Sequence, residues 1–260
     1  MSWDIDRVKD ELHKIDLRRK KIKDSEFFET VEEVFDYSTL MILYDLINNG
    51  FIDVMYGVVN SGKEARIYFA RDRNGLDLAV KIYLTSTSEF RKGMLTYIIG
   101  DPRFKVSSRK TRDIIYVWAR KEYSNLSKAY GVGVRVPKPI TVKGNVLVME
   151  FIGVDGVPAP LLKDYIPLNV DSFFNVLMDY VRKLYVDARL VHGDLSEYNI
   201  MVFNDSPVLI DFGQAVDLSH PMAEELLVRD INNLLEFFSD VGVDTPDLEE
   251  ALSWVKGVKR

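Results

Sequence analysis

The sequence predicts an α+β protein of two lobes, with an antiparallel sheet plus a helix in the first lobe and mostly helices in the second. Three runs rich in Val, Ile, Tyr and Phe and separated by glycine come first, at residues 51–59, 64–70 and 76–84. Helical periodicity dominates the second half, interrupted by one short hairpin near residues 200–210. Strands grouped before helices, rather than alternating with them, favour an α+β plan.

The composition indicates a soluble intracellular protein. The 260 residues are 47% hydrophobic and 28% charged, which is enough for a full core, and the absence of cysteine excludes disulfides and thiolate chemistry. The charged residues 1–23 hold no apolar signal core, and no run approaches the roughly 18 apolar residues of a membrane span. We therefore expect a cytoplasmic protein with no membrane partner. A net charge of −6 argues against a generally basic surface, so no DNA partner is expected.

The first lobe, residues 51–152, is expected to follow an N-terminal helical segment, residues 1–50. The last helix of that segment should begin at Ser38 as its cap and stop at Gly50. A basic run within the segment favours a solvated helix, with an RNA-contacting arm as the alternative. The elements expected in the lobe are the three strands, a flexible loop at 85–112, a helix at about 113–129 and a hairpin at 139–142 and 145–151.

The second lobe is expected over residues 153–260. Glycines and prolines near residues 150–160 interrupt regular structure and mark the linker. An apolar helical face follows at 173–188, and further helices are expected near 222–238 and 246–255.

The hairpin of the second lobe carries the strongest functional pattern. Asp194 and Asn199 lie five residues apart, and Asp211 opens an Asp-Phe-Gly. The hairpin should bring Asn199 and Asp211 to the same end of two paired strands, with Asp194 beside them. These are oxygen ligands of the kind that Mg²⁺ prefers, with one carboxylate left to orient a nucleophile. Kinases organise phosphoryl transfer in this way. His192 is expected to brace the loop rather than to act as a base.

A lysine inside an apolar strand predicts a buried ion pair. Lys81 needs a partner because a buried ammonium is costly to leave unpaired. Glu122 is the single carboxylate on the apolar stripe of the 113–129 helix, while Glu89 is the alternative that lies closer in sequence. Such a pair is typical of the kinase lysine and glutamate that hold the α- and β-phosphates.

The segment GVVNSGKE, residues 57–64, nearly fits a P-loop. Glu64 stands where that pattern requires a hydroxyl, and a strand follows where a helix should open, so we reject a P-loop NTPase. A turn with Ser61, Gly62 and Lys63 at its tip can still fold over a triphosphate, with an ordinary hairpin turn as the alternative.

Several motifs together resemble the RIO family of atypical serine protein kinases, and most closely its first subfamily. They are SGKEARIY (61–68), VKIY (80–83), WARKEYSNL (118–126), VMEFIG (148–153), PAPLLK (158–163) and HGDLSEYN (192–199). The resemblance covers about residues 30–240. It implies a trimmed kinase fold that binds ATP with Mg²⁺ or Mn²⁺, phosphorylates serine, hydrolyses ATP and acts on the pre-ribosomal small-subunit particle, through protein and possibly rRNA.

The resemblance also implies roles for individual residues. Asp194 would be the catalytic aspartate, and Asn199 and Asp211 would be metal ligands. Asp211 would in addition accept phosphate covalently. The nucleotide-binding residues that it implies are Ser61, Lys63, Lys81 and Glu122, with the hinge backbone at Glu150 and Ile152.

Two alternatives stay open. A small-molecule phosphotransferase of the aminoglycoside type shares the His-Gly-Asp and Asp-Phe-Gly patterns, although its large acidic helical region would not fit after Asp211 in this chain. A ribosome-assembly factor driven by ATP hydrolysis, with little protein phosphorylation, would use the same ATP site.

The stretch 85–112 carries seven basic and two acidic residues, a net of +5. We expect a mobile loop near the ATP cleft that docks acidic protein surface or rRNA phosphate, with a disordered insertion as the alternative. Ser107 and Ser108 are candidate autophosphorylation sites within it.

Overall fold

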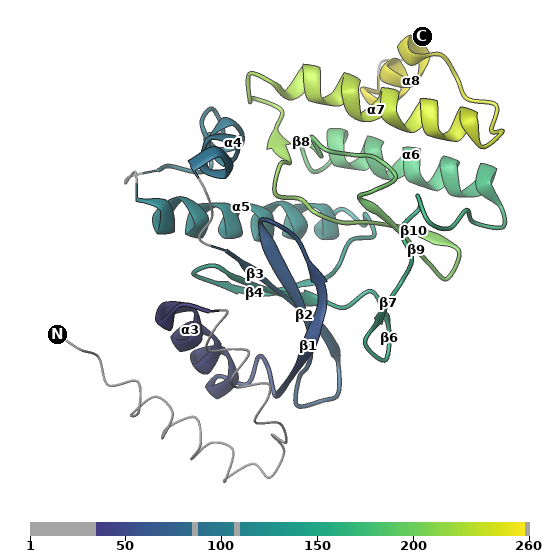
Figure 1. The fold of residues 1–260 in the computed structure, drawn as a ribbon. Coiled ribbons are helices and arrows are strands. Elements are labelled where there is room, and N and C mark those ends of the chain that lie inside the picture. Colours follow the sequence, from purple (N-terminus) through teal and green to yellow (C-terminus); the bar gives the residue numbers. More distant parts are fainter. Residues whose placement is uncertain (1–34, 85–87, 107–109, 258–260) are drawn as a thin grey trace.

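The computed structural model describes residues 35–84, 88–106 and 110–257, and confirms a two-lobe α+β architecture (Figure 1). The first lobe contains α3 (Tyr37–Asn48), β1 (Val54–Ser61), β2 (Ala65–Arg71), β3 (Asp77–Tyr83), α4 (Ser88–Ile98), α5 (Thr111–Gly131), β4 (Pro139–Lys143) and β5 (Val146–Glu150). The second contains β6 (Gly153–Val154), β7 (Val157–Pro158), α6 (Val170–Val186), β8 (Leu190–Val191), β9 (Ile200–Phe203), β10 (Ser206–Leu209), β11 (Val216–Asp217), α7 (Ala223–Asp240) and α8 (Leu248–Val255). The basic run near residue 20 and the serines Ser107 and Ser108 lie outside the described residues.

The five strands of the first lobe form one antiparallel sheet in the order β1-β2-β3-β5-β4. Strand β3 is central, and because successive side chains of a strand point to opposite faces, it serves two cores. Leu78, Val80 and Ile82 pack into the cluster that α3 covers. Ala79 and Tyr83 belong to the main core on the other face. The same alternation places Lys81 on the face toward α5.

Two expectations for the first lobe are wrong in detail. The cap of α3 is Asp36 rather than Ser38, since the Asp36 carboxylate accepts a hydrogen bond from the Thr39 N–H at 2.9 Å. The loop expected over residues 85–112 contains helix α4. Met94 and Ile98, one helical turn apart, are buried against the main core, and this contact stabilises a helix whose polar neighbours concealed its periodicity.

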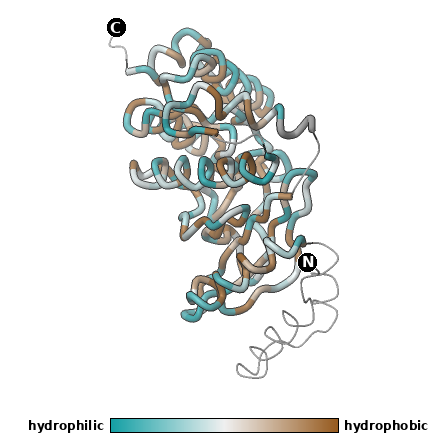
Figure 2. The backbone as a smooth tube through the Cα atoms, turned by 90° about the vertical axis from the view of Figure 1, so that its left-hand side faces the viewer, coloured by the Kyte–Doolittle hydropathy of each residue, from teal (hydrophilic) through white to brown (hydrophobic). Residues whose placement is uncertain are grey.

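The second lobe has three main helices, and α6, α7 and α8 lie together at one end of the molecule (Figure 1). Hydrophobic and hydrophilic residues alternate along these helices, as expected where one face is buried (Figure 2). Within the described ranges, no helix combines the length and the apolar character needed to cross a membrane. The expected hairpin is present as β9 and β10, which pair in antiparallel register around Asn204 and Asp205. Both turn residues have positive φ, at 51° and 57°, as a tight hairpin turn requires.

Candidate active site

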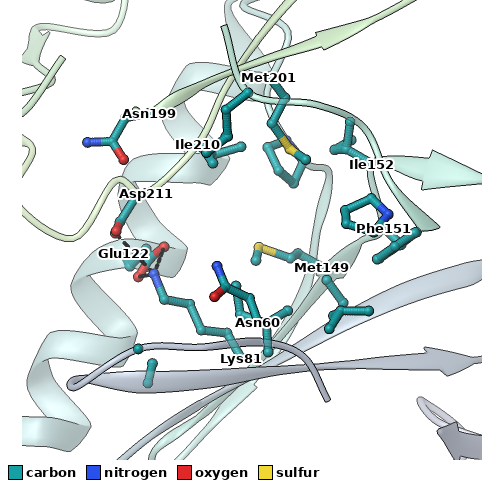
Figure 3. A pocket seen from close by; sticks show the side chains of 18 of the residues that line it. Asn60, Lys81, Glu122, Met149, Phe151, Ile152, Asn199, Met201, Ile210 and Asp211 are labelled. Atoms are coloured by element: carbon teal, nitrogen blue, oxygen red, sulfur yellow. Dashed lines mark hydrogen bonds and ion pairs between the residues drawn. The ribbon is translucent and has the colours of Figure 1, made fainter. Parts of the chain in front are cut away.

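A cavity of about 560 Å³ lies where the sheet, α5, the β5–β7 linker and the β9–β10 hairpin meet (Figure 3). It has two chemically different ends. The charged end is formed by Glu64, Lys81, Glu122, Asn199 and Asp211. The apolar end is formed by Met149, Phe151, Ile152, Met201 and Ile210.

Lys81 joins three elements at the charged end. Its Nζ lies 2.9 Å from both Oε1 and Oε2 of Glu122 and 3.0 Å from Oδ1 of Asp211. Lys81 is 7% exposed and Glu122 is 1% exposed, so their pair is shielded from water. The predicted contact with Glu122 is confirmed, and the structure adds Asp211 as a second partner that the sequence pattern did not indicate.

The protonation of this cluster follows from one ammonium facing two carboxylates. Burial alone would lower the pKa of Lys81, but Asp211 and Glu122 outweigh it and the net shift is upward. Burial raises the pKa of Glu122 to about 7, against the opposing effect of Lys81. Desolvation within the cavity works against ionisation of Asp211, yet the Lys81 ammonium lowers the pKa of that carboxyl overall. The lysine therefore stays charged, and Asp211 is its ionised partner toward the cavity.

Asp194 and Asn199 lie next to Asp211, as predicted. The Asn199 Nδ2 donates to the Asp194 backbone carbonyl at 2.7 Å and to its Oδ2 at 3.1 Å. Gln214 also donates to that Oδ2 at 3.1 Å, a partner that the motif did not reveal. The Ile210 N–H donates to the Asn199 carbonyl at 3.0 Å, which fixes the two ends of the hairpin together. Burial and the nearby Asp211 charge raise the pKa of Asp194.

These residues fit a divalent metal that also takes ligands from a nucleotide. Since the Asn199 amide nitrogen is engaged by Asp194, the amide oxygen is left for another partner, and the Asp211 side chain is 53% exposed. In the part of the chain that the structure describes, no group of three or more His, Cys, Asp or Glu side chains could hold a metal alone. One carboxylate and one amide oxygen match the way Mg²⁺ binds with substrate phosphates.

His192 braces the site and is not placed to act as a base. It is 2% exposed, its Nε2 lies 3.0 Å from the Ile210 carbonyl, and its ring packs on Phe212 at 4.7 Å. A carbonyl partner requires that Nε2 carry the proton and donate it. Burial lowers the pKa of His192 to about 4, so the ring is neutral near pH 7. The expected bracing role is confirmed.

Asp230 on α7 is a site residue that the motifs did not reveal. Its carboxylate accepts from the Gly193 N–H at 2.7 Å and from the Leu195 N–H at 2.9 Å, so it holds the backbone on both sides of Asp194. Burial raises its pKa to about 7 even with these two donors. A signal existed in the sequence, because Asp230 is an acidic residue on the apolar face of a helix between Leu227 and Ile231.

The turn between β1 and β2 differs from the expectation at one position. Lys63 and Gly62 line the cavity, as expected. Ser61 is exposed, pairs with Arg66 across the sheet and does not line the cavity, whereas Asn60 does. Strand β1 has a register shift between Val58 and Asn60, which interrupts the regular alternation of its side chains just before the turn.

Glu150 and Ile152 both line the cavity where β5 leaves the sheet. The Glu150 side chain is bound by Arg135 through two hydrogen bonds of 2.7 Å, and its N–H donates to the Lys138 carbonyl at 2.9 Å. The Ile152 carbonyl accepts from the Ala159 N–H at 3.0 Å. The Glu150 N–H and the Ile152 carbonyl are therefore engaged within the protein.

Comparison with known proteins gives a consistent result. The sequence model of the RIO domain family matches residues 66–251. A RIO-type serine/threonine-protein kinase Rio1 of Methanocaldococcus jannaschii is 44% identical over 229 residues, covering 88% of this chain and 78% of that protein. The human serine/threonine-protein kinase RIO1 is 38% identical, covering 90% of this chain and 42% of that protein.

A solved structure shares the fold. The Rio2 kinase of Chaetomium thermophilum, in a complex with ADP, Mg²⁺ and phosphoaspartate, superimposes with a TM-score of 0.61 at 22% identity. The match covers 84% of this chain and 66% of the other.

Proposed function

The chain belongs to the RIO family of serine/threonine-protein kinases, and we propose that it binds ATP with a divalent metal and transfers the γ-phosphate to a serine hydroxyl. The observation that carries this proposal is the convergence of Glu122 and Asp211 on the Lys81 ammonium, each at 3.0 Å or less, with Asp194 and Asn199 beside them. This constellation supplies a cation for phosphate, oxygen ligands for a metal and a carboxylate for the acceptor hydroxyl.

The nucleotide would span the two ends of the cavity. Adenine fits the apolar end, between Met149 and Met201, where the Ile152 N–H and the Glu150 carbonyl can recognise its edge. The triphosphate would then reach Lys81, with the turn residue Lys63 above it. A cavity of about 560 Å³ is within the usual range for a ligand of this size.

The residues of the charged end would divide the chemistry. Asn199 and Asp211 would hold Mg²⁺ or Mn²⁺, which supplies charge neutralisation on the phosphates when bound. Asp194, kept in place by Asn199 and Gln214, would orient the serine hydroxyl and accept its proton. Glu122 keeps the Lys81 ammonium fixed, so that the cation does not fold back toward solvent.

ATP hydrolysis and a role in small ribosomal subunit maturation belong to the same proposal. Asp211 would attack the γ-phosphate, ADP would leave, and water would then hydrolyse the aspartyl phosphate to free phosphate. The partner would be a pre-ribosomal small-subunit particle, and the protein could serve it chiefly as an ATP-driven assembly factor. The family resemblance supports these finer points.

Purified protein with γ-labelled ATP and Mg²⁺ tests the proposal. We expect label on serine, and about 10²- to 10⁴-fold less with Asp194→Asn, while calorimetry shows that both proteins bind ATP. Free phosphate released in large excess over labelled protein would favour the assembly-factor form. If the wild-type protein binds no ATP in the presence of Mg²⁺ or Mn²⁺, the proposed function is wrong.

A further inference from the structure

Two buried side chains of α5 bind the backbone of the loop that begins at Asp211. The Lys121 Nζ donates to the Gly213 carbonyl at 2.9 Å and to the Ala215 carbonyl. The Asn125 Nδ2 donates to the Phe212 carbonyl at 3.0 Å and to the Ala215 carbonyl at 2.8 Å. Four hydrogen bonds from one helix therefore hold three backbone carbonyls within the four residues that follow the predicted metal ligand.

Both side chains are costly to bury. Lys121 is 0% exposed. The charge of Asp101 stabilises the Lys121 ammonium, but Asp101 forms an ion pair with Arg103 at 2.6 Å, and the Arg103 charge opposes this effect. Burial lowers the pKa of Lys121 to about 7. The Asn125 Oδ1 is buried and has no hydrogen-bond partner among the described residues. An apolar side chain at either position would avoid these costs. The presence of Lys121 and Asn125 therefore indicates that the loop carbonyls need these hydrogen-bond donors.

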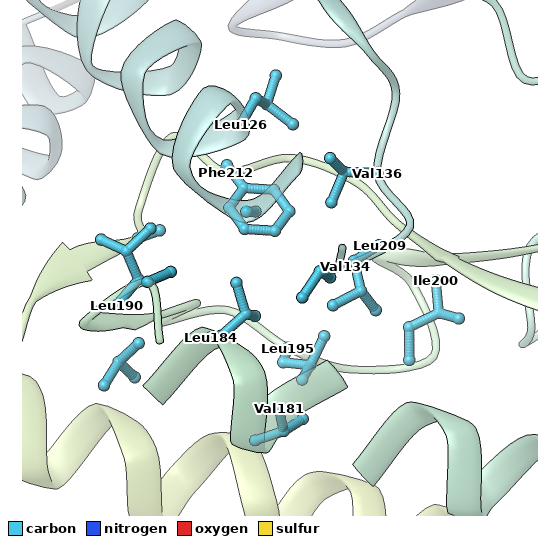
Figure 4. Packing of buried hydrophobic residues seen from close by; sticks show 14 of the residues in the cluster. Leu126, Val134, Val136, Val181, Leu184, Leu190, Leu195, Ile200, Leu209 and Phe212 are labelled. Carbon is cyan, nitrogen blue, oxygen red and sulfur yellow. The ribbon is translucent and has the colours of Figure 1, made fainter. Parts of the chain in front are cut away.

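The loop needs external restraint because its backbone is unusual. Asp211 has φ of 62°, in the left-handed region that a non-glycine residue rarely adopts. Gly213 lies so close to Trp118 of α5 that a Cβ would approach the indole within 2.8 Å. Phe212 is fully buried and anchors the loop in the core below (Figure 4). Removing the two α5 side chains would take one hydrogen bond from the Gly213 carbonyl and two from the Ala215 carbonyl, and would leave the Phe212 carbonyl with the Ala215 N–H at 3.3 Å.

We propose that Lys121 and Asn125 are positioning residues that hold the Asp211 carboxylate in its metal-binding orientation by fixing the carbonyls of Phe212, Gly213 and Ala215. The adjacent Glu122 binds Lys81, so one turn of α5 sets both the phosphate-binding cation and the metal loop. A movement of α5 would displace the two together. This inference deepens the proposed function and rests on it for the identity of the metal site.

Asn125→Ala is the decisive variant, and Asn145→Ala is its matched control. Asn145 is also buried, also donates two hydrogen bonds through Nδ2, to Thr39 Oγ1 and the Tyr83 carbonyl, and also has an unpartnered Oδ1. It lies in the β4–β5 hairpin rather than at the metal loop. Both variants should lose comparable thermal stability, which separates a general packing effect from an effect on the metal.

Two readouts should distinguish the variants. Asn125→Ala should weaken Mn²⁺ binding about 10- to 100-fold, measured by electron paramagnetic resonance with a non-hydrolysable ATP analogue, as is usual when support of a metal ligand is lost. Hydrogen exchange of residues 211–216 should accelerate in the same variant. Asn145→Ala should leave both unchanged. Lys121→Met, which keeps length and removes the donor, should reproduce the Asn125→Ala result.

If Asn125→Ala and Lys121→Met both fold and bind Mn²⁺ as the wild-type protein does, the proposal is overturned. Equal Mn²⁺ weakening in Asn145→Ala would also overturn it, since the effect would then be one of stability. Should Lys121→Met not fold, Asn125→Ala decides alone. A wild-type protein that binds Mn²⁺ and the analogue but transfers no phosphate would contradict the proposed function and leave the positioning role intact.

Discussion

The two ends of the cavity are built in opposite ways. At the charged end, carboxylates from α5 and the metal loop each lie within 3.0 Å of the Lys81 ammonium on β3, and the charges of the three groups shift one another's pKa values. At the apolar end, methionine, phenylalanine and isoleucine side chains line the cavity (Figure 3). Single substitutions should therefore cause large losses of stability or activity at the charged end and small ones at the apolar end.

Asp194→Asn should produce the largest effect. Asparagine has the shape of aspartate, and its amide oxygen can still accept hydrogen bonds from Asn199 and Gln214. It cannot take the proton of the acceptor hydroxyl. We expect phosphoryl transfer in single-turnover experiments to fall about 10²- to 10⁴-fold, while ATP affinity by calorimetry changes little because Asp194 does not line the cavity. A folded Asp194→Asn protein that transfers phosphate at more than about a tenth of the wild-type rate would show that the acceptor is activated elsewhere.

Lys81→Met should be the most destabilising substitution at the charged end. It leaves Glu122 as a buried carboxylate without its cation, a change that typically costs about 3–5 kcal/mol. Chemical denaturation measures the loss, and a double-mutant cycle with Glu122→Gln measures the coupling. Because burial already raises the pKa of Glu122 to about 7, the second substitution should restore part of the stability. Strictly additive effects would mean that the two side chains are independent and that the pair is not the organising contact.

His192, which braces the loop next to the charged end, makes the stability of the protein depend on pH. Its folded pKa of about 4 is depressed below the ordinary 6.5 by burial, so the unfolded chain binds the proton more readily and protonation favours unfolding. The neutral ring makes its full contribution to the free energy of unfolding above pH 6.5. This contribution, roughly 3 kcal/mol in total, is lost as the pH falls toward 4. The unfolding free energy of His192→Gln should decline less between pH 7 and pH 5 than that of the wild-type protein. Parallel declines in the two proteins would contradict this assignment.

The sequence predicted the charged end far better than the apolar end. A lysine in an apolar strand and a glutamate on an apolar helical face are improbable unless they meet, so Lys81 and Glu122 could be paired across 41 residues. The hairpin spacing likewise placed Asn199 and Asp211. Asp230, Lys121 and Asn125 carried the same kind of signal, as polar residues on buried helical faces, but nothing in the sequence indicated that their partners are backbone atoms.

Tertiary packing decided the features that the sequence did not reveal. Met149, Met201 and Ile210 are ordinary core residues by pattern, and only the fold leaves a cavity between them. Helix α4 has too short an apolar stripe to be distinguished from its polar surroundings until it packs on α5. The side that Ser61 faces depended on the register of β1 with β2, which the turn sequence alone does not fix.

Met149→Leu tests the gradual response expected at the apolar end. The substitution conserves volume and hydrophobicity, so we expect a stability change below about 1.5 kcal/mol. The KM for ATP should change by less than about tenfold, which corresponds to 1.4 kcal/mol. Thermal unfolding and steady-state kinetics measure the two quantities. Complete loss of ATP use in a folded Met149→Leu protein would mean that this end, like the other, depends on one contact.

Ser61→Ala should have the smallest effect of all. Ser61 does not line the cavity and pairs with Arg66 across the sheet, while its neighbour Asn60 lines the cavity. We expect the KM for ATP to change by no more than about twofold, or roughly 0.4 kcal/mol, in Ser61→Ala, and by more in Asn60→Ala. The serine hydroxyl can reach the triphosphate only if the β1–β2 turn rotates when the nucleotide binds. The contrary result would be a KM for ATP that rises more than about tenfold in Ser61→Ala and stays near the wild-type value in Asn60→Ala. It would show that the β1–β2 turn changes its conformation over the phosphates, so that the charged end is complete only when the nucleotide is bound.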